Sequence, residues 1–401
     1  MRIVVAPDSF KGSIGAAAAA AALADGWRGA RPDDEVDCLP LADGGEGTLD
    51  VLAAAVPGAR WHAATVSGPA RQHVASCWLE LPGRTAVIEL ARASGLPLLA
   101  SPDPLGAHTA GTGELIGRAL DAGTTRIIIA LGGSASTDGG AGALSALGAR
   151  FLDAAGNPLA AGGGALARLA SADLSGLRPP PPGGVSCLTD VAAPLLGPFG
   201  AAAVFGPQKG AGPRQVAALE AGLARLARLL GGEPAAPGAG AAGGTGYGFS
   251  AAWGAAIVPG AAELGRIAGL DATLPGASLV ITGEGRYDRT STAGKVAGAV
   301  LAAAAMAGVP AALVAGSIAD GTIAAGPIAA GRPAGRWQRA VSLTDLAGSA
   351  AAARQDPAHW LGQAGRLRPL GVSCASHAAL RQLSASDPSK EPDDVYSTGD
   401  G

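Results

Sequence analysis

The chain has 401 residues, of which 48% are hydrophobic and 15% are charged, and its formal net charge at pH 7 is −3. At about 150 residues per domain, this length predicts two or three domains. The nearly balanced charge gives no electrostatic reason to expect binding to nucleic acid or to an anionic membrane. The four cysteines are scattered, and no apolar run has the order of a signal peptide, so we expect a cytoplasmic protein.

Apolar runs followed by polar loops and helices recur along the chain, a pattern typical of βαβ units with a parallel sheet. Strands are predicted at Arg2–Ala6, Val36–Ala42, Thr85–Leu90, Arg126–Leu131, Val185–Thr189, Ala277–Ile281, Ala311–Ala315 and Val341–Leu343, with an antiparallel pair within Trp61–Glu80. Helices are predicted at Ile14–Arg28, Leu49–Ala55, Thr109–Asp121, Ala141–Ala149, Gln215–Leu230 and Val296–Met306. Connections are predicted at Ala160–Pro182 and at Gly231–Gly248, the latter flexible, and Ser384–Gly401 is predicted to be a disordered tail.

The polar loop predicted at Thr282–Lys295 lies between a strand and a helix. Ligands bind at the carboxyl ends of parallel strands, and helix N-termini favour anions. Glu284 and Asp288 could hold a metal or accept a proton, and Lys295 could neutralise phosphate charge. The alternative is a solvated loop with a capped helix.

The loop Gly132–Gly140 follows the clearest strand of the chain and has the composition of a phosphate-binding loop. Its glycines allow close approach of a phosphate to backbone N–H groups, Ser134 and Ser136 add hydroxyl donors, and Asp138 could hold Mg²⁺. The alternative is a glycine-rich turn required by tight packing of strand against helix. The chain has no Walker A sequence and no GxGxxG after a strand.

Further polar residues follow other predicted strands. Lys11 could bind an anionic substrate and Asp8 a hydroxyl or a metal, unless both are ordinary surface residues. Asp43 and Glu46 are suited to one cation or to hydroxyl groups, although helix capping would also explain them. Asp190 ends a strand, where a catalytic base is plausible.

Six motifs carry a family likeness: APDSFKGS (6–13), ADGGEGT (42–48), GTGEL (111–115), GGSASTDGGAGAL (132–144), FGPQKGAG (205–212) and TGEGRYDRTSTAGK (282–295). Together they closely resemble the bacterial class I glycerate kinases, from about residue 1 to residue 370. The resemblance implies ATP-dependent phosphorylation of D-glycerate, with Mg²⁺, at the 2-hydroxyl. Asp190 stands in TDVAAPLLG, where the family tends to have an Asn before the proline, and the sequence after about Gly371 does not resemble the family's closing helix.

The resemblance also implies two α/β domains with mainly parallel sheets and an active site in the cleft between them. We predict that residues 1–85 and 275–370 form one discontinuous, Rossmann-like domain and that residues 86–274 form an inserted domain. The partners expected are glycerate and ATP, without nucleic acid or membrane, and a homodimer is possible. The alternatives are a non-catalytic sensor of a sugar acid or nucleotide and a nicotinamide-dependent dehydrogenase.

Phosphoryl transfer to glycerate requires an anchor for the carboxylate, a base for the hydroxyl and a cation beside the phosphates. We expect Lys11 to be the anchor, Asp190 the base with Asp8 as second candidate, and Glu284 and Asp288 the metal ligands, with Asp138 in reserve. The residues predicted to bind substrate are Ser9, Lys11, Asp43, Glu46 and Arg286. The residues predicted to bind nucleotide are Gly132, Gly133, Ser134, Ser136, Asp138, Gly139, Lys209 and Lys295.

Overall fold

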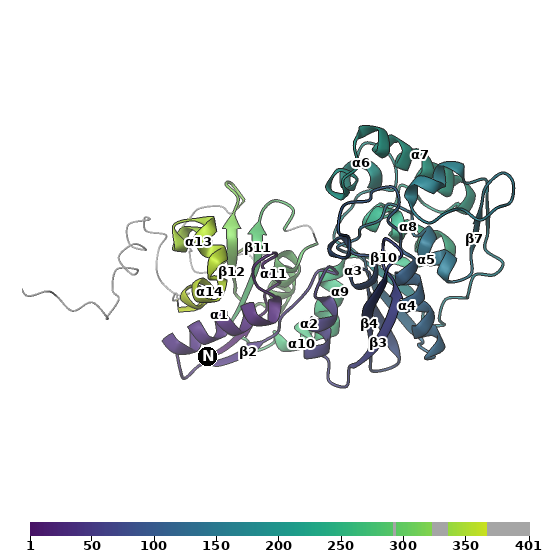
Figure 1. Cartoon of the computed structure of the whole chain (residues 1–401). Helices are drawn as coiled ribbons and strands as arrows, with labels where there is room; N and C mark the ends of the chain where they lie inside the picture. Colours follow the sequence, from purple (N-terminus) through teal and green to yellow (C-terminus); the bar gives the residue numbers. More distant parts are fainter. Residues whose placement is uncertain (292–293, 323–335, 367–401) are drawn as a thin grey trace, which may run out of the picture.

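A computed structural model describes residues 1–291, 294–322 and 336–366. These residues form two lobes, each built around a sheet (Figure 1). The tail predicted at Ser384–Gly401 lies outside the described residues.

The first lobe contains a five-stranded sheet in which every neighbouring pair is parallel. Its strands, in spatial order, are β13 (Arg339–Ser342), β12 (Ala311–Ile318), β11 (Leu279–Tyr287), β1 (Arg2–Val5) and β2 (Glu35–Cys38). Successive residues of β1 point to opposite faces, so Ile3 and Val5 join one apolar cluster while Val4 joins another. Burial of both faces explains why Ile3, Val4 and Val5 are all apolar.

The second lobe contains a six-stranded sheet that is parallel except at one edge. Its strands are β10 (Ala256–Val258), β9 (Val185–Leu188), β6 (Arg126–Ala130), β5 (Thr85–Glu89), β4 (His73–Leu81) and β3 (Arg60–Ser67). The edge strands β3 and β4 are antiparallel, as the alternation in Trp61–Glu80 predicted. A small two-stranded sheet pairs β7 (Arg150–Leu152) with β8 (Ser171–Asp173).

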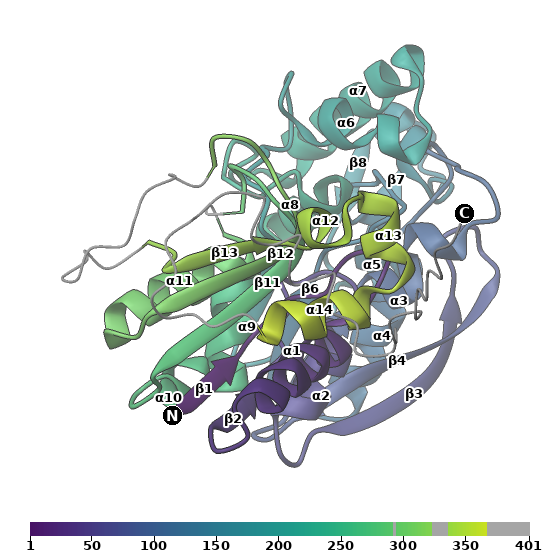
Figure 2. The ribbon, with the colours of Figure 1, turned by 90° about the vertical axis from the view of Figure 1, so that its left-hand side faces the viewer.

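Helices cover both faces of each main sheet (Figures 1 and 2). The first lobe contains α1 (Ala16–Ala30), α11 (Val296–Ala307), α12 (Leu343–Ala347), α13 (Ala350–Gln355) and α14 (Pro357–Arg366). The helices of the second lobe and its junction are α2 (Thr48–Ala55), α3 (Ala91–Ser94), α4 (Ala110–Asp121), α5 (Ala141–Ala146), α6 (Ala201–Phe205), α7 (Pro213–Leu230), α8 (Ala241–Trp253), α9 (Gly260–Ala268) and α10 (Leu270–Thr273). Short 3₁₀ turns occur at Leu96–Leu98, Gly163–Arg168 and Pro207–Lys209.

The chain crosses between the lobes after β2 and returns through α9. On α9, Ala261 and Ala268 pack in the core of the first lobe, whereas Leu264 packs with α2 against the second sheet. Strands β3 and β4, which the predicted boundary at residue 85 placed with the chain ends, pair with β5 in the six-stranded sheet. Strand pairing therefore favours a crossing near residues 39–47, and the division into two folding domains stays a prediction.

Three local predictions differ from the structure. The connection predicted at Ala160–Pro182 contains the 3₁₀ turn Gly163–Arg168 and strand β8. The predicted loop at Thr282–Lys295 begins as strand, because β11 extends to Tyr287 and pairs with β12 as far as Ile318. The segment predicted to be flexible at Gly231–Gly248 instead contributes most of the buried helix α8. Glycine composition indicated flexibility there, but the glycines permit close backbone packing in the second lobe.

Gly243 shows this packing most clearly, because a Cβ placed there would lie 2.1 Å from the carbonyl oxygen of Ser136, and its φ is +65°. Gly254 has a similar φ of +66°, but a Cβ there would meet no atom within 4 Å. We expect Gly243→Ala to lower the free energy of unfolding by about 2–4 kcal/mol, from overpacking and the left-handed backbone together. Gly254→Ala should cost only the backbone part, about 1–2 kcal/mol. Urea titrations check this, and equal losses in the two variants would contradict it.

Candidate active site

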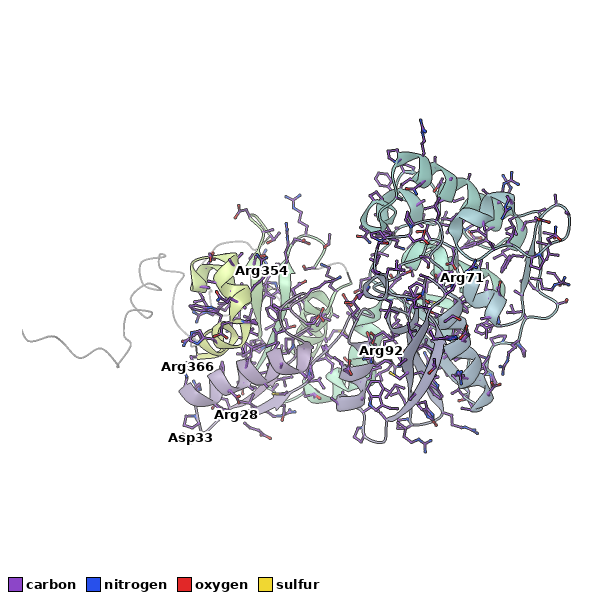
Figure 3. The ribbon with its side chains drawn as sticks, in the orientation of Figure 1. Arg28, Asp33, Arg71, Arg92, Arg354 and Arg366 are labelled. Carbon is purple, nitrogen blue, oxygen red and sulfur yellow. The ribbon has the colours of Figure 1, made fainter. Side chains whose placement is uncertain are left out.

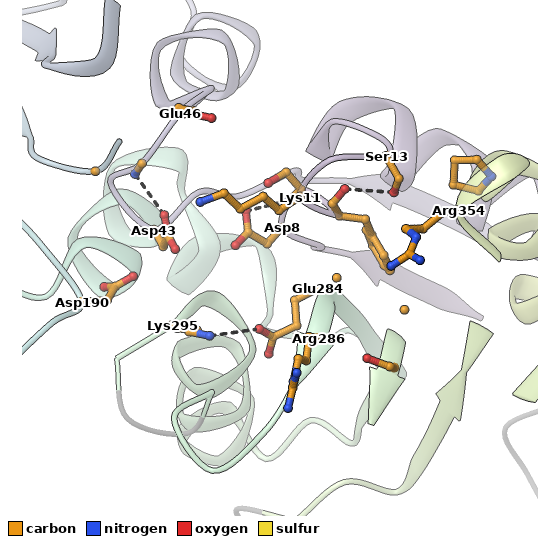
Figure 4. Close-up of a pocket in the computed structure, with 18 of the residues that line it drawn as sticks. Asp8, Lys11, Ser13, Asp43, Glu46, Asp190, Glu284, Arg286, Lys295 and Arg354 are labelled. Carbon is orange, nitrogen blue, oxygen red and sulfur yellow. Dashed lines mark hydrogen bonds and ion pairs between the residues drawn. The ribbon is translucent and has the colours of Figure 1, made fainter. Parts of the chain in front are cut away.

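A cleft of about 570 Å³ lies where the carboxyl ends of both sheets meet (Figure 4). Its size is typical of a site for a small-molecule ligand. Eleven of the residues predicted from sequence line it, drawn from both lobes and from the crossing after β2. They are Asp8, Ser9, Lys11, Asp43, Glu46, Gly132, Gly133, Asp190, Glu284, Arg286 and Lys295.

The loop at Asp43–Glu46 is held in place by backbone contacts with the second lobe. The N–H of Gly132 donates to the carbonyl oxygen of Gly44 at 3.0 Å, and a Cβ on Gly132 would lie 2.4 Å from Gly45. Buried Glu89, at the end of β5, accepts the N–H groups of Gly47 and Leu49, both at 3.2 Å. Sequence analysis missed Glu89, although an acid at the carboxyl end of a buried strand was a signal.

Asp190 follows β9, and its two carboxylate oxygens have different surroundings. Its Oδ1 accepts the N–H of Gly260, the first residue of α9, at 3.2 Å, whereas its Oδ2 is buried without a hydrogen-bond partner. Burial, and then the nearby negative charge of Asp43, raise the pKa of Asp190 to about 8. A carboxyl group with its pKa near neutrality is suited to accept a proton.

Two further carboxyl groups, those of Glu284 and Asp8, line the same cleft as Asp190 and Asp43. Glu284, on β11, is 6% exposed, and its Oε1 has no hydrogen-bond partner, while Lys295 Nζ lies 3.8 Å from its Oε2. Burial raises the pKa of Glu284 to about 7. Burial and the charge of Asp43 also raise the pKa of Asp8, whose Oδ1 accepts the N–H of Ser9 at 2.6 Å. Such neighbouring acids favour a shared proton or a compensating positive charge, although in the described part of the chain no three His, Cys, Asp or Glu side chains come together as a metal site.

The other residues predicted to bind nucleotide lie behind the cleft. Ser134, Ser136, Asp138, Gly139 and Lys209 do not line it. Asp138 accepts hydrogen bonds from Thr109 Oγ1 at 2.8 Å and from the N–H groups of Thr109 and Gly142 at 2.9 and 3.1 Å. Lys209 Nζ donates to the carbonyl oxygen of Ser136, and burial lowers the pKa of Lys209 to about 8. These side chains brace the loop after β6.

Asp288, predicted as a metal ligand, also does not line the cleft. Its Oδ1 accepts the N–H and Oγ1 hydroxyl of Thr290 at 2.9 and 2.6 Å, and these hydrogen bonds lower its pKa. Its contacts are those of a residue that stabilises a turn.

The family model of the glycerate kinases, described as "Glycerate kinase family", matches residues 3–366. The chain belongs to the glycerate kinase family. The family resemblance predicted from the six motifs is thereby confirmed.

Curated relatives of the glycerate kinase family cover about three quarters of the chain. The glycerate 2-kinase of Escherichia coli K12 is 44% identical over 309 residues, which cover 74% of this chain and 80% of that protein. The glycerate kinase of Bacillus subtilis 168 is 44% identical over 308 residues, which cover 74% and 79% of the two chains.

A crystal structure provisionally assigned as glycerate kinase 2 from Salmonella typhimurium LT2 has the same fold. It matches with a TM-score of 0.75 and 37% identity, over 96% of this chain and 98% of that one. The predicted α/β class with mainly parallel sheets is confirmed. Within the described part of the chain, no helix combines the length and apolar character needed to cross a membrane.

Several residues that line the cleft carried no motif signal. They come from the C-terminal part of the first lobe and include Ser317, Thr344 and Arg354. Arg354 stands in the Ala-rich run of α13, where neither spacing nor composition suggested a site. Ser317 lies on β12 itself, and the packing of α12 and α13 beside β12 brings Thr344 and Arg354 to the cleft.

The raised pKa values predict how stability depends on pH in the presence of EDTA. The unfolded chain releases the protons of Asp190 and Glu284 near pH 4, whereas the folded chain retains them until about pH 8 and about pH 7. Between these values the folded state binds more protons, so the free energy of unfolding falls as pH rises. Glu284→Gln should flatten this decline. Urea titrations at about pH 5, 6.5 and 8 check the slope, and a decline of equal steepness in Glu284→Gln would contradict the prediction.

Proposed function

We propose that the protein transfers the γ-phosphoryl group of ATP to the 2-hydroxyl of D-glycerate. The observation that carries this proposal is that Asp190, whose Oδ2 is buried without a hydrogen-bond partner, lines the same cleft as the cationic side chain of Lys11. A hydroxy acid needs both groups, a base for its hydroxyl and a cation for its carboxylate. Membership of the glycerate kinase family supports a kinase over a sensor or a dehydrogenase.

Asp190 acts as the base in this proposal. Its ionised carboxylate accepts the proton of the substrate hydroxyl, the freed oxygen forms a bond to the γ-phosphorus, and the bond from that phosphorus to ADP breaks. Asp43 keeps the pKa of Asp190 high, which strengthens it as a base once it is ionised. Asp8 is the second candidate for this role.

Mg²⁺ fits the cleft because Glu284 Oε1 is buried and lacks a partner, and because the charge of Glu284 contributes to raising the pKa of Asp8, so a positive charge beside them would be stabilising. We propose that Glu284 and Asp8 hold Mg²⁺. If bound there, Mg²⁺ would neutralise negative charge that develops on the phosphoryl group during transfer. Asp288, which lies outside the lining of the cleft, is replaced by Asp8 in this assignment. Cytoplasmic location and a homodimer stay predictions.

Lys11 is proposed as the carboxylate anchor. Figure 4 shows its amino group extending toward the side of the cleft occupied by Asp43. Loss of a charge-assisted hydrogen bond of about 1.5–3 kcal/mol predicts that Lys11→Met raises the KM for glycerate roughly ten- to a hundredfold. Lys11→Arg should rescue only part of this loss. The positive charge is kept, but the planar guanidinium differs in shape from the compact ammonium group of lysine. Steady-state kinetics with thermal melts check it, and wild-type kcat/KM in Lys11→Met would make Lys11 an ordinary surface lysine.

The experiment that tests the function is a coupled ADP-release assay. D-Glycerate, L-glycerate, lactate and tartronate are compared at equal concentration, with ATP and Mg²⁺ present. The proposal predicts that D-glycerate supports the highest kcat/KM. Equal ATP hydrolysis with and without any hydroxy acid would reject it.

A further inference from the structure

The basic residues that line the cleft come from one lobe, although that lobe also contributes the acids Asp8 and Glu284. Among the described lining residues, every basic side chain belongs to the five-stranded lobe: Lys11, Arg286, Lys295 and Arg354. The crossing loop and the six-stranded lobe contribute only acids to the charged lining: Asp43, Glu46 and Asp190. With four basic and two acidic side chains on the five-stranded lobe and acids alone on the other side, a polyphosphate is attracted more to the five-stranded lobe.

Many backbone donors of the glycine-rich loop after β6 are already used within the protein. The N–H groups of Gly132, Ala135 and Gly139 donate to the carbonyl oxygens of Gly44, Ser94 and Gly243. Those of Ser136, Gly140 and Gly142 donate to the side chains of Ser134 and Asp138. The glycines themselves are needed for packing, since a Cβ on Gly139 would lie 2.3 Å from Leu226.

Arg354 has the properties of an anion-binding residue. It projects from α13 into the cleft and is exposed, and no ion pair with a described carboxylate occupies it (Figure 4). Figure 3 shows that Arg28 and Arg366 of the same lobe lie on its lower side, away from Arg354. Around Arg354 the cleft is lined by small apolar residues, Ala350, Ala353 and Pro357, and by the hydroxyl-bearing Ser13 and Ser317.

We infer that the nucleotide phosphates bind along the five-stranded lobe, where Arg354 contacts them, and not on the glycine-rich loop after β6. This inference rests on the proposed function and departs from the nucleotide site predicted from sequence. Asp190 and Arg354 lie on opposite sides of the cleft, with Asp8 and Glu284 between them (Figure 4). Glycerate has only three carbons, so when it is bound beside Asp190 it does not extend to Arg354. Arg354 is then available to contact ATP, the longer substrate. The γ-phosphate then reaches the acids while the rest of the nucleotide extends toward α13.

The test is calorimetric binding of ADP, with Mg²⁺ present, to wild type, Arg354→Gln and the control Arg366→Gln. The control removes the same charge from the same lobe, but Arg366 does not line the cleft. A charge-assisted contact to phosphate predicts a Kd for ADP that is roughly ten- to a hundredfold higher in Arg354→Gln alone. The KM for D-glycerate should stay within about twofold of wild type, because no contact with glycerate is removed.

Three results would overturn the inference. One is an unchanged Kd for ADP in a folded Arg354→Gln protein, and another is an equal rise in Arg366→Gln. The third is a higher KM for glycerate with unchanged ADP binding, which would place the substrate carboxylate at Arg354. The proposed function is tested separately, because a wild-type protein that binds ADP without phosphorylating glycerate would refute the function and leave the phosphate site standing.

Discussion

Asp190→Asn is expected to lower kcat by about 10²- to 10⁴-fold, the usual contribution of a positioned general base. The amide keeps an oxygen that can accept the N–H of Gly260, so α9 should stay in place. It has no carboxylate to accept the proton of the substrate hydroxyl. The KM for glycerate should change little, because the missing interaction forms only as the proton moves.

The thermal stability of Asp190→Asn distinguishes a role of Asp190 as general base from a structural role. The raised pKa of Asp190 means that the folded chain disfavours its ionised form, so that form costs stability above the unfolded pKa. Asp190→Asn removes this cost and should unfold at the same temperature as wild type or higher at pH 8. The control Asp271→Asn alters an exposed acid on α10. A tenfold loss of kcat in the control, or wild-type kcat in Asp190→Asn, would contradict the assignment.

Removal of divalent cations by EDTA is expected to abolish turnover, and Glu284→Gln to raise the Mg²⁺ concentration needed for half-maximal rate at least about tenfold. The amide retains the shape of Glu284 but loses the charge that would balance the ion. The control Glu233→Gln changes an exposed acid that does not line the cleft. The measurements are initial rates over a Mg²⁺ titration and the rise in melting temperature with Mg²⁺. Turnover that persists in EDTA would refute the metal requirement. An unchanged Mg²⁺ titration in Glu284→Gln would refute the assignment of Glu284 as a ligand of the ion.

The order of strands and helices was largely predictable, because apolar runs buried on both faces and the polar loops after them leave clear local signals. The residues at the carboxyl ends of β1, β9 and β11 were found for the same reason. Their convergence on one cleft follows from parallel pairing, since all such ends meet at one edge of a sheet.

The sequence was misleading where glycine is abundant and uninformative where a position depends on long-range packing. Glycine allows both exposed flexible loops and very close backbone packing, and composition cannot distinguish these uses. Gly243 is packed against the backbone of Ser136, so a segment that indicated flexibility is part of the core of the second lobe. Gly139 is packed against Leu226, while the phosphate site predicted on its loop stays a prediction. Arg354 was missed because its position depends on how α13 packs, a long-range contact without a local pattern.

The proposed reaction forms a bond between the γ-phosphorus of ATP and the oxygen of the 2-hydroxyl of D-glycerate. Phosphorus NMR of the product from ATP and D-glycerate distinguishes a phosphate on the 2-hydroxyl from one on the 3-hydroxyl. We predict a single new resonance from 2-phospho-D-glycerate that grows as ADP appears. A resonance from 3-phosphoglycerate alone would contradict the position of transfer, and ADP formation without any phosphoglycerate would contradict the function.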